Sequence, residues 1–246
     1  MKKLNWRMKL GLGLAVATVV LLGIHYLIFH DWHHLAIYGM HDIAMMPLEV
    51  LVVTMILHSL LERRAHQEML HKLNMVIGAF FSEVGTGLLH RAAGLDDNLE
   101  IREQFLVSAK WDAARYDEAK RAAGKYDYTV RADAAALEEL RAFVVAKRPF
   151  LLGLLQNPNL LEHESFTDML WAVFHLSEEL EHRTSFGDLP ESDLRHLAGD
   201  IKRAYAALAV EWLDHVRHLQ SAYPYLFSLA VRTNPLDTNA VITVGE

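Results

Sequence analysis

The hydrophobic pattern divides the sequence into an apolar first quarter and a longer remainder with helical periodicity. Residues 10–30 contain no Asp, Glu, Lys or Arg, and residues 35–61 contain two acids and neither Lys nor Arg. An α-helix rises about 1.5 Å per residue, so about 20 apolar residues cross the hydrocarbon core of a bilayer. We therefore predict a transmembrane hairpin within residues 1–61, with its turn at residues 31–34.

Basic residues flank both outer ends of this predicted hairpin. Lys2, Lys3 and Lys9 precede the first apolar run, whereas Arg63 and Arg64 follow the second, and the turn has neither Lys nor Arg. The positive-inside rule then places both termini in the cytoplasm. We expect a multi-pass protein of the bacterial inner membrane, with the lipid bilayer as a partner. A cleaved signal peptide is the alternative for the first run, but that run is longer than is usual for one.

Beyond residue 61 the apolar positions recur every three or four residues, which is typical of an amphipathic helix. These positions are Leu70, Leu73, Val76, Ile77, Phe80, Phe81, Val84 and Leu88. The stripe predicts a helical stalk over residues 62–92. We expect Gly85, Gly87 and Gly94 to mark its end, because glycine often terminates helices.

Turn-forming residues divide the rest of the chain into further helices. The expected helices lie near residues 97–122, 133–156, 165–183 and 191–222, and a short amphipathic piece follows Pro224. Ser165 is expected to cap the third of these. Together they predict a cytoplasmic helical bundle over residues 93–232, followed by a tail at 233–246. The predicted fold class is thus all-α: a transmembrane hairpin, a stalk and a bundle.

Composition narrows the classes of function. Lys and Arg number 24 against 31 Asp and Glu, and the net charge of −7 argues against nucleic acid as a partner. The chain has no cysteine, which excludes disulfides, thiolate nucleophiles and Cys-type zinc sites. It also has no phosphate-binding loop, dinucleotide glycine fingerprint or nucleophile elbow. We therefore expect no catalytic activity and no cofactor.

Two segments resemble a known family. The segments LNMVIGAFFSEVG, at residues 73–85, and YPYLFSLAVRTNP, at residues 223–235, are similar to parts of a family of bacterial inner-membrane proteins. Members of that family have an N-terminal transmembrane hairpin and a helical cytoplasmic domain, and the family has no assigned activity. The resemblance implies the same architecture for most of this chain and supplies no site residues.

The apolar runs contain ionisable groups at costly positions. Glu49 lies 14 residues past Leu35, which is about 20 Å along a helix and close to the bilayer centre. Asp42 precedes it on the same face, and His25 of the first run is expected to pair with Asp42. An ionised side chain at this depth costs about 3 kcal/mol, so it should face protein or water. Glu49 is therefore expected either to form a hydrogen bond across a helix interface or to line a proton or ion route through an oligomer.

Histidines also cluster at the predicted turn. His30, His33, His34 and His41 would lie together outside the membrane. Imidazole binds Zn²⁺ and Cu²⁺ well, so this external cluster is a candidate for metal or pH sensing. The alternative is that these residues are simply polar groups at the membrane interface.

The expected bundle contains two sets of metal-ligand residues. His175, Glu179 and His182 share a helical face, and Glu179 with His182 forms the Glu-x-x-His spacing of di-iron bundles. Those sites need a second such pair, which this sequence lacks beyond residue 92. The other set, on the last long helix, is Glu211, His215 and His218. A solvated helical face and a buried histidine are the preferred interpretations, so we expect no stoichiometric transition metal.

These inferences favour a homo-oligomeric, membrane-anchored helical scaffold, sensor or accessory subunit without catalytic activity. An oligomeric ion or proton channel lined by the second apolar run, with Asp42 and Glu49, is the main alternative. A metal-binding helical bundle is the third. A cytoplasmic or membrane protein partner is expected under the first interpretation.

Overall fold

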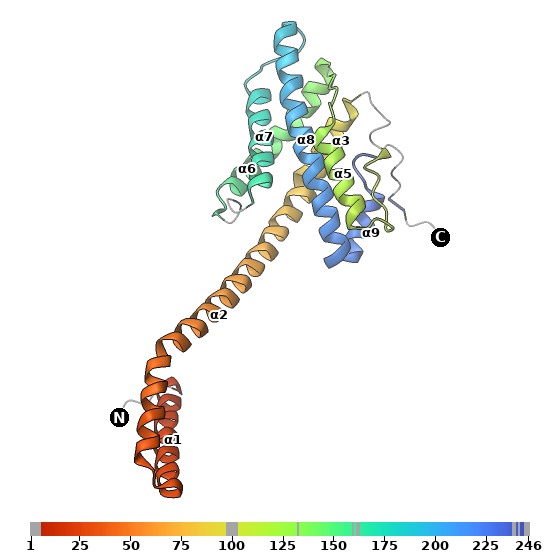
Figure 1. Ribbon diagram of the computed structural model, residues 1–246. Helices are drawn as coiled ribbons and strands as arrows, with labels where there is room; N and C mark the ends of the chain where they lie inside the picture. Colours follow the sequence, from red (N-terminus) through yellow and green to blue (C-terminus); the bar gives the residue numbers. More distant parts are fainter. Residues whose placement is uncertain are drawn as a thin grey trace. The chain divides into compact units, whose positions relative to one another are not determined.

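The computed structural model is all-helical (Figure 1). It describes residues 6–96, 103–131, 133–158, 160, 163–237, 240 and 242–243. Its helices are α1 (Trp6–Phe29), α2 (Trp32–Phe80), the π-helix η1 (Phe81–Gly85), α3 (Thr86–Gly94), α5 (Ala113–Lys125), α6 (Ala134–Leu155), α7 (Glu164–Glu181), α8 (Glu191–Ala222) and α9 (Pro224–Arg232). One isolated antiparallel bridge, Asp96 to Val130, is the only β-type pairing among these residues. The chain forms two compact units, unit 1 (residues 1–66) and unit 2 (residues 67–246).

Unit 1 consists of α1 and the first part of α2, joined by a turn that is tighter than the sequence suggested. The turn occupies only His30 and Asp31, since His33 and His34 already belong to α2. His30 adopts a left-handed conformation with φ 51°, which histidine tolerates better than most residues. The carboxylate of Asp31 accepts a hydrogen bond of 3.0 Å from the backbone N–H of His34 and so caps α2.

The helices of unit 1 leave their apolar side chains uncovered. From Trp6 to Glu68, each side chain that the structure describes is exposed, except for half-buried His25 and Leu35. Both α1 and α2 are long and apolar enough to cross a membrane, by length and composition alone. An exposed apolar surface of this extent is typical of sites that contact a membrane or another protein.

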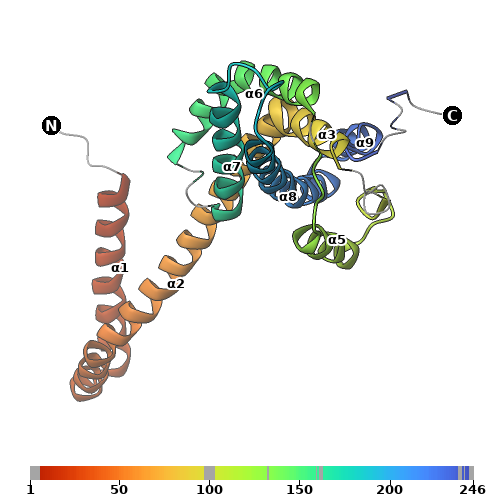
Figure 2. The same cartoon turned by 90° about the horizontal axis from the view of Figure 1, so that it is seen from above.

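Unit 2 is organised around α8. Figures 1 and 2 both show α7 on one side of α8 and α5 on the other, and α3 and α9 also pack against α8. Six of the eight stripe positions expected after residue 61 are buried in this unit: Leu73, Ile77, Phe80, Phe81, Val84 and Leu88. The Phe80 ring packs edge-on against Phe166 of α7, at 5.3 Å between centroids. The C-terminal part of α2 is therefore a core helix of unit 2.

Two expected helices differ from the sequence prediction. The helix expected near residues 97–122 is not continuous, because residues 104–112 are non-helical and α5 begins at Ala113, where the Asp112 carboxylate accepts a 2.9 Å hydrogen bond from the Arg115 N–H; residues 97–102 lie outside the described residues. Phe105 is instead buried in a non-helical segment, where the Asn234 side chain donates to its carbonyl. Helix α7 begins at Glu164, capped by the His163 ring rather than by Ser165.

The expectation for Gly85 and Gly87 was also wrong, because both lie inside continuous helix. A Cβ atom on Gly85 would lie 2.6 Å from the Phe81 ring and 2.7 Å from the Phe80 ring, and one on Gly87 would lie 2.8 Å from the Phe143 ring. These glycines allow aromatic rings to pack directly on the helix backbone. Gly94, by contrast, is the last residue of α3, as expected.

Candidate functional site

A cavity of about 570 Å³ in unit 2 lies between the end of α2, η1, α8 and α9. Its apolar wall includes Met75, Phe81, Trp212, Leu219, Leu226 and Leu229. Its polar groups include Asn74, Ser82, Thr86, His215, His218, Tyr223 and Thr233. An apolar wall with a few convergent polar groups is typical of sites for small molecules.

The two histidines of this cavity are neutral at neutral pH. The His215 ring stacks on Phe81, with 4.9 Å between centroids and 12° between planes. Burial, followed by the nearby His218, lowers the pKa of His215 to about 4. Burial also lowers the pKa of His218, and its buried Nε2 atom has no hydrogen-bond partner among the described residues. The cavity therefore offers uncharged imidazoles as donors or acceptors to a bound molecule.

The π-helix η1 shapes one wall of the cavity. It extends from Phe81 to Gly85 between α2 and α3, and it contributes Phe81 and Ser82 to the lining. Single π-turns inside longer helices are frequent at functional sites, because the inserted residue turns a side chain onto a new face. The site is suited to binding an apolar molecule with one or two hydrogen bonds.

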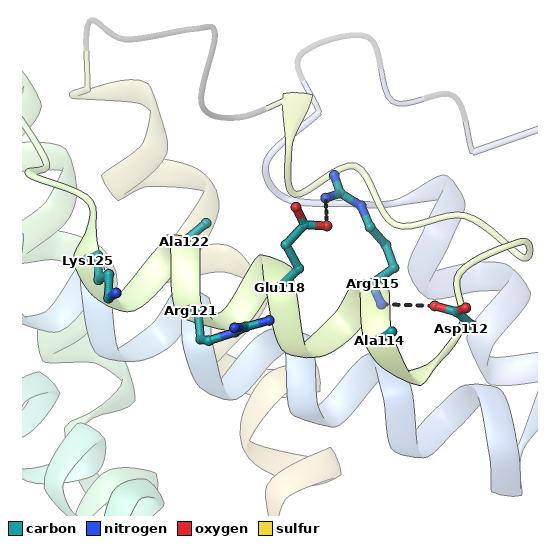
Figure 3. A pocket seen from close by; sticks show the side chains of 7 residues that line it. All are labelled: Asp112, Ala114, Arg115, Glu118, Arg121, Ala122 and Lys125. Atoms are coloured by element: carbon teal, nitrogen blue, oxygen red, sulfur yellow. Dashed lines mark hydrogen bonds and ion pairs between the residues drawn. The ribbon is translucent and has the colours of Figure 1, made fainter.

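A second hollow, of about 690 Å³, lies along α5 (Figure 3). Its seven lining residues all come from Asp112 and α5, so one helix makes its whole described wall. Arg115 is already paired there with Glu118 at 2.7 Å, and Asp112 is occupied as the helix cap. This hollow is a feature of an exposed helix surface and offers no convergent groups to a ligand.

The metal-ligand candidates of α7 are split by the structure. His182 turns back onto its own helix, with its Nδ1 atom 2.7 Å from the Glu178 carbonyl oxygen. His175 and Glu179 instead face α8, where they meet His196 and Asp200, two residues that sequence reasoning missed. The missed signal is a repeated spacing, since HLSEE at residues 175–179 and HLAGD at residues 196–200 both place His four residues before an acid.

Arginines hold the acids around this cluster. Arg183 donates to the Glu179 carboxylate at 2.8 Å and forms a two-point pair with Asp193. The hydrogen bond from Arg183 lowers the pKa of Glu179 despite its partial burial. Arg203 contacts the other acid, Asp200, at 3.1 Å. Both carboxylates are therefore oriented from outside the cluster.

The second candidate set, on α8, does not form a joint site. Glu211 is buried and faces His163 and Ser165 at the start of α7, whereas His215 and His218 line the apolar cavity. Burial raises the pKa of Glu211, opposed by a hydrogen bond from Ser165. The sequence placed these side chains on one helix face, but α8 contacts different neighbours along its length.

The candidates in the apolar helices lie apart from one another. Asp42 contacts His41 at 3.6 Å rather than the expected His25, whose ring lies against Phe29. Glu49 is exposed and has no partner among the described residues. Its position leaves it facing whatever covers α2.

The histidines near the turn are spread along the chain rather than gathered. His30 lies in the turn, and His33, His34 and His41 are exposed on α2. The His34 ring lies 4.5 Å from the Tyr38 ring. In the part of the chain that the structure describes, the only group of three ligand residues close enough to share an ion is Glu179, His196 and Asp200.

Comparison with known proteins follows the same two-part division. Residues 2–61 match a family model described as the MJ1433 N-terminal helical domain, and residues 69–232 match one described as the C-terminal helical domain of uncharacterized protein MJ1433. The chain is 39% identical over 233 residues to that protein of Methanocaldococcus jannaschii, which covers 95% of this chain and 94% of the relative. No solved structure matches the chain. The chain therefore belongs to the family of helical proteins represented by the archaeal protein MJ1433.

Proposed function

We propose that this protein is a membrane-anchored sensor or accessory subunit, without catalytic activity, which binds an apolar molecule in the cavity lined by η1, α8 and α9. The observation that carries the anchoring is the uncovered apolar surface of α1 and α2. The hydrocarbon core of a bilayer is a favourable environment for such a surface, whereas its exposure to water is unfavourable. The cavity, with Trp212 and two neutral histidines in its wall, supports a binding role for unit 2.

The proposed membrane is the cytoplasmic membrane of the cell, with both termini inside. Basic residues at both outer ends of the apolar helices and their absence from the turn support this orientation. The sequence interpretation named a bacterial inner membrane, but the relative described above is archaeal. The proposal is therefore restricted to a cytoplasmic membrane.

The orientation can be tested by cysteine labelling, because the natural chain has no cysteine. His33→Cys, next to the turn, should react with a membrane-impermeant maleimide in intact cells. Ser228→Cys, on the exposed surface of α9, is the control and should react only after permeabilisation. The reverse pattern would show that the orientation is wrong. Release of the protein from membranes by alkaline carbonate would overturn the anchoring itself.

We also propose that α2 mediates self-association. Glu49 is exposed on an apolar helix without a partner in its own chain, and an acid near the bilayer centre is stabilised by facing protein or water. A second copy of α2 supplies such a surface. The same exposure of Asp42 and Glu49 favours an oligomeric proton or ion channel as the second candidate function. Flux through the reconstituted protein that Glu49→Gln removes would favour the channel.

Binding in the cavity can be followed through Trp212. We expect a brominated medium-chain fatty acid to quench Trp212 fluorescence saturably in the full chain, once the other four tryptophans are replaced by Phe. Gly78→Leu should abolish the quenching, because Gly78 lines the cavity and a Cβ atom there meets only the His215 ring, at 3.6 Å. Gly153→Leu, with open space around it in α6, is the matched control and should quench like the parent. Unsaturable quenching, or equal quenching in the Gly78 variant, would remove the cavity as the binding site.

A further inference from the structure

The cluster between α7 and α8 is built from two identical spacings on consecutive helices. His175 and Glu179 are four residues apart on α7, and His196 and Asp200 are four residues apart on α8. Four residues make about one helical turn, so each pair presents its two side chains on one face. The two faces meet because α7 and α8 pack along each other.

The nitrogen and oxygen atoms of the cluster converge at a common spacing. The His196 Nε2 atom lies 3.3 Å from Asp200 Oδ2 and 3.5 Å from Glu179 Oε2. The His175 Nε2 atom lies 3.6 Å from the same Asp200 oxygen and 3.9 Å from Glu179 Oε1. Ligand atoms bound tetrahedrally at about 2.0–2.1 Å from a metal lie about 3.3–3.5 Å from one another. The three contacts of 3.3, 3.5 and 3.6 Å are close to those edges, whereas the contact between His175 and Glu179 is longer and involves the other Glu179 oxygen, Oε1.

Asp200 supplies the second, independent observation. Its side chain is 3% exposed, and its buried Oδ2 atom forms no well-aligned hydrogen bond with the described residues, although the two imidazole nitrogens lie 3.3 and 3.6 Å away. Its other oxygen, Oδ1, faces Arg203. A buried carboxylate oxygen left without a donor is destabilising. A cation between Oδ2 and the two imidazoles would remove that penalty.

The surroundings of the cluster are those of a supported metal site. Arg183 donates to Oε2 of Glu179, the oxygen that also faces His196, whereas Arg203 contacts Oδ1 of Asp200 and leaves Oδ2 to the imidazoles. Such outer contacts orient metal-binding carboxylates in known sites. Two imidazoles and two carboxylates suit a first-row divalent transition metal such as Zn²⁺, whereas Ca²⁺ and Mg²⁺ prefer oxygen alone.

We propose that Glu179, His196 and Asp200, with His175 as the fourth ligand, bind one divalent transition-metal ion that joins α7 to α8. This site differs from the sequence expectation of no stoichiometric metal, which rested on the lack of a second Glu-x-x-His pair. The further ligands lie on α8, where His196 and Asp200 are four residues apart and do not form a Glu-x-x-His pair. The proposal is independent of the apolar cavity and of the membrane anchor.

The test uses the full chain in detergent, stripped with a chelator and then titrated with Zn²⁺. We expect about one zinc per chain and, at a free concentration 100 times Kd, a folding equilibrium constant about 100-fold larger. Asp200→Asn keeps the side-chain shape but should weaken zinc binding at least 100-fold, as should His196→Ala. His182→Ala is the matched control, because the His182 ring bonds to the Glu178 carbonyl of its own helix, and this variant should bind zinc like wild type.

Cobalt(II) gives a readout that does not depend on the variants folding. Wild type loaded with Co²⁺ should show the intense visible absorption of a tetrahedral site, and one equivalent of Zn²⁺ should remove it. A bound zinc content well below one per chain would show that the cluster is only an ion-pair network, and it would overturn the proposal. Undiminished binding in Asp200→Asn, or an equal loss in His182→Ala, would also overturn it.

Discussion

Replacing Trp212 by Ala should destabilise unit 2 by about 3–5 kcal/mol, the range for deleting a large buried aromatic side chain. Trp212 is 2% exposed at the centre of α8 and also forms part of the cavity wall. Its loss removes buried apolar area from the helix that contacts most other elements of the unit. Denaturant unfolding of the full chain in detergent, followed by far-UV circular dichroism, measures the change.

Trp171 provides a matched control on the neighbouring helix. Its side chain is 55% exposed on α7 and contacts Phe174 edge-on at 6.1 Å. Trp171→Ala should change the free energy of unfolding by only about 0.5 kcal/mol, as is usual for surface positions. Equal effects of the two substitutions would contradict the packing of α8 described above.

Unit 2 should lose stability in acid through His215. The pKa of this histidine is about 4 in the folded chain and about 6.5 when the chain is unfolded. Between these values the unfolded chain binds more protons, so the free energy of unfolding falls as the pH is lowered from 6.5 to 4. Since one pKa unit corresponds to about 1.4 kcal/mol, His215 should account for a loss of roughly 3 kcal/mol. Unfolding curves collected across this pH range measure it.

His215→Phe isolates this effect. A phenyl ring can stack on Phe81 as the imidazole does, but it does not titrate, so the variant should be less sensitive to acid than wild type. His218 has a lowered pKa and acts in the same direction, whereas buried Glu211 has a raised pKa and acts oppositely. His218 and Glu211 are present in wild type and in the variant, so their contributions cancel when the two pH profiles are subtracted. If the stability of both proteins changed equally with pH, the prediction that His215 is buried in its neutral form would be wrong.

Local sequence signals located most helices correctly. The structure has helices at Ala134–Leu155, Glu191–Ala222 and Pro224–Arg232, close to the expected ranges, because Pro and Asn breaks act on the chain within a few residues. The helix expected from residue 97 failed for the opposite reason. Phe105 fell within the expected helix, but in the structure it is buried in a non-helical segment that a distant residue, Asn234, contacts. The expectation for Gly85 failed in the same way, because this glycine allows aromatic rings to pack on the helix and does not end it.

The sequence by itself determined an all-helical chain with two long apolar runs followed by amphipathic helices, because hydrophobic periodicity and turn residues act locally. Only the tertiary structure decided which side chains meet. It separated His182 from His175 and Glu179, joined those two to His196 and Asp200, and directed Glu211 away from His215. Helical spacing defines the face on which a residue lies, whereas the neighbour facing it depends on how α7 and α8 pack.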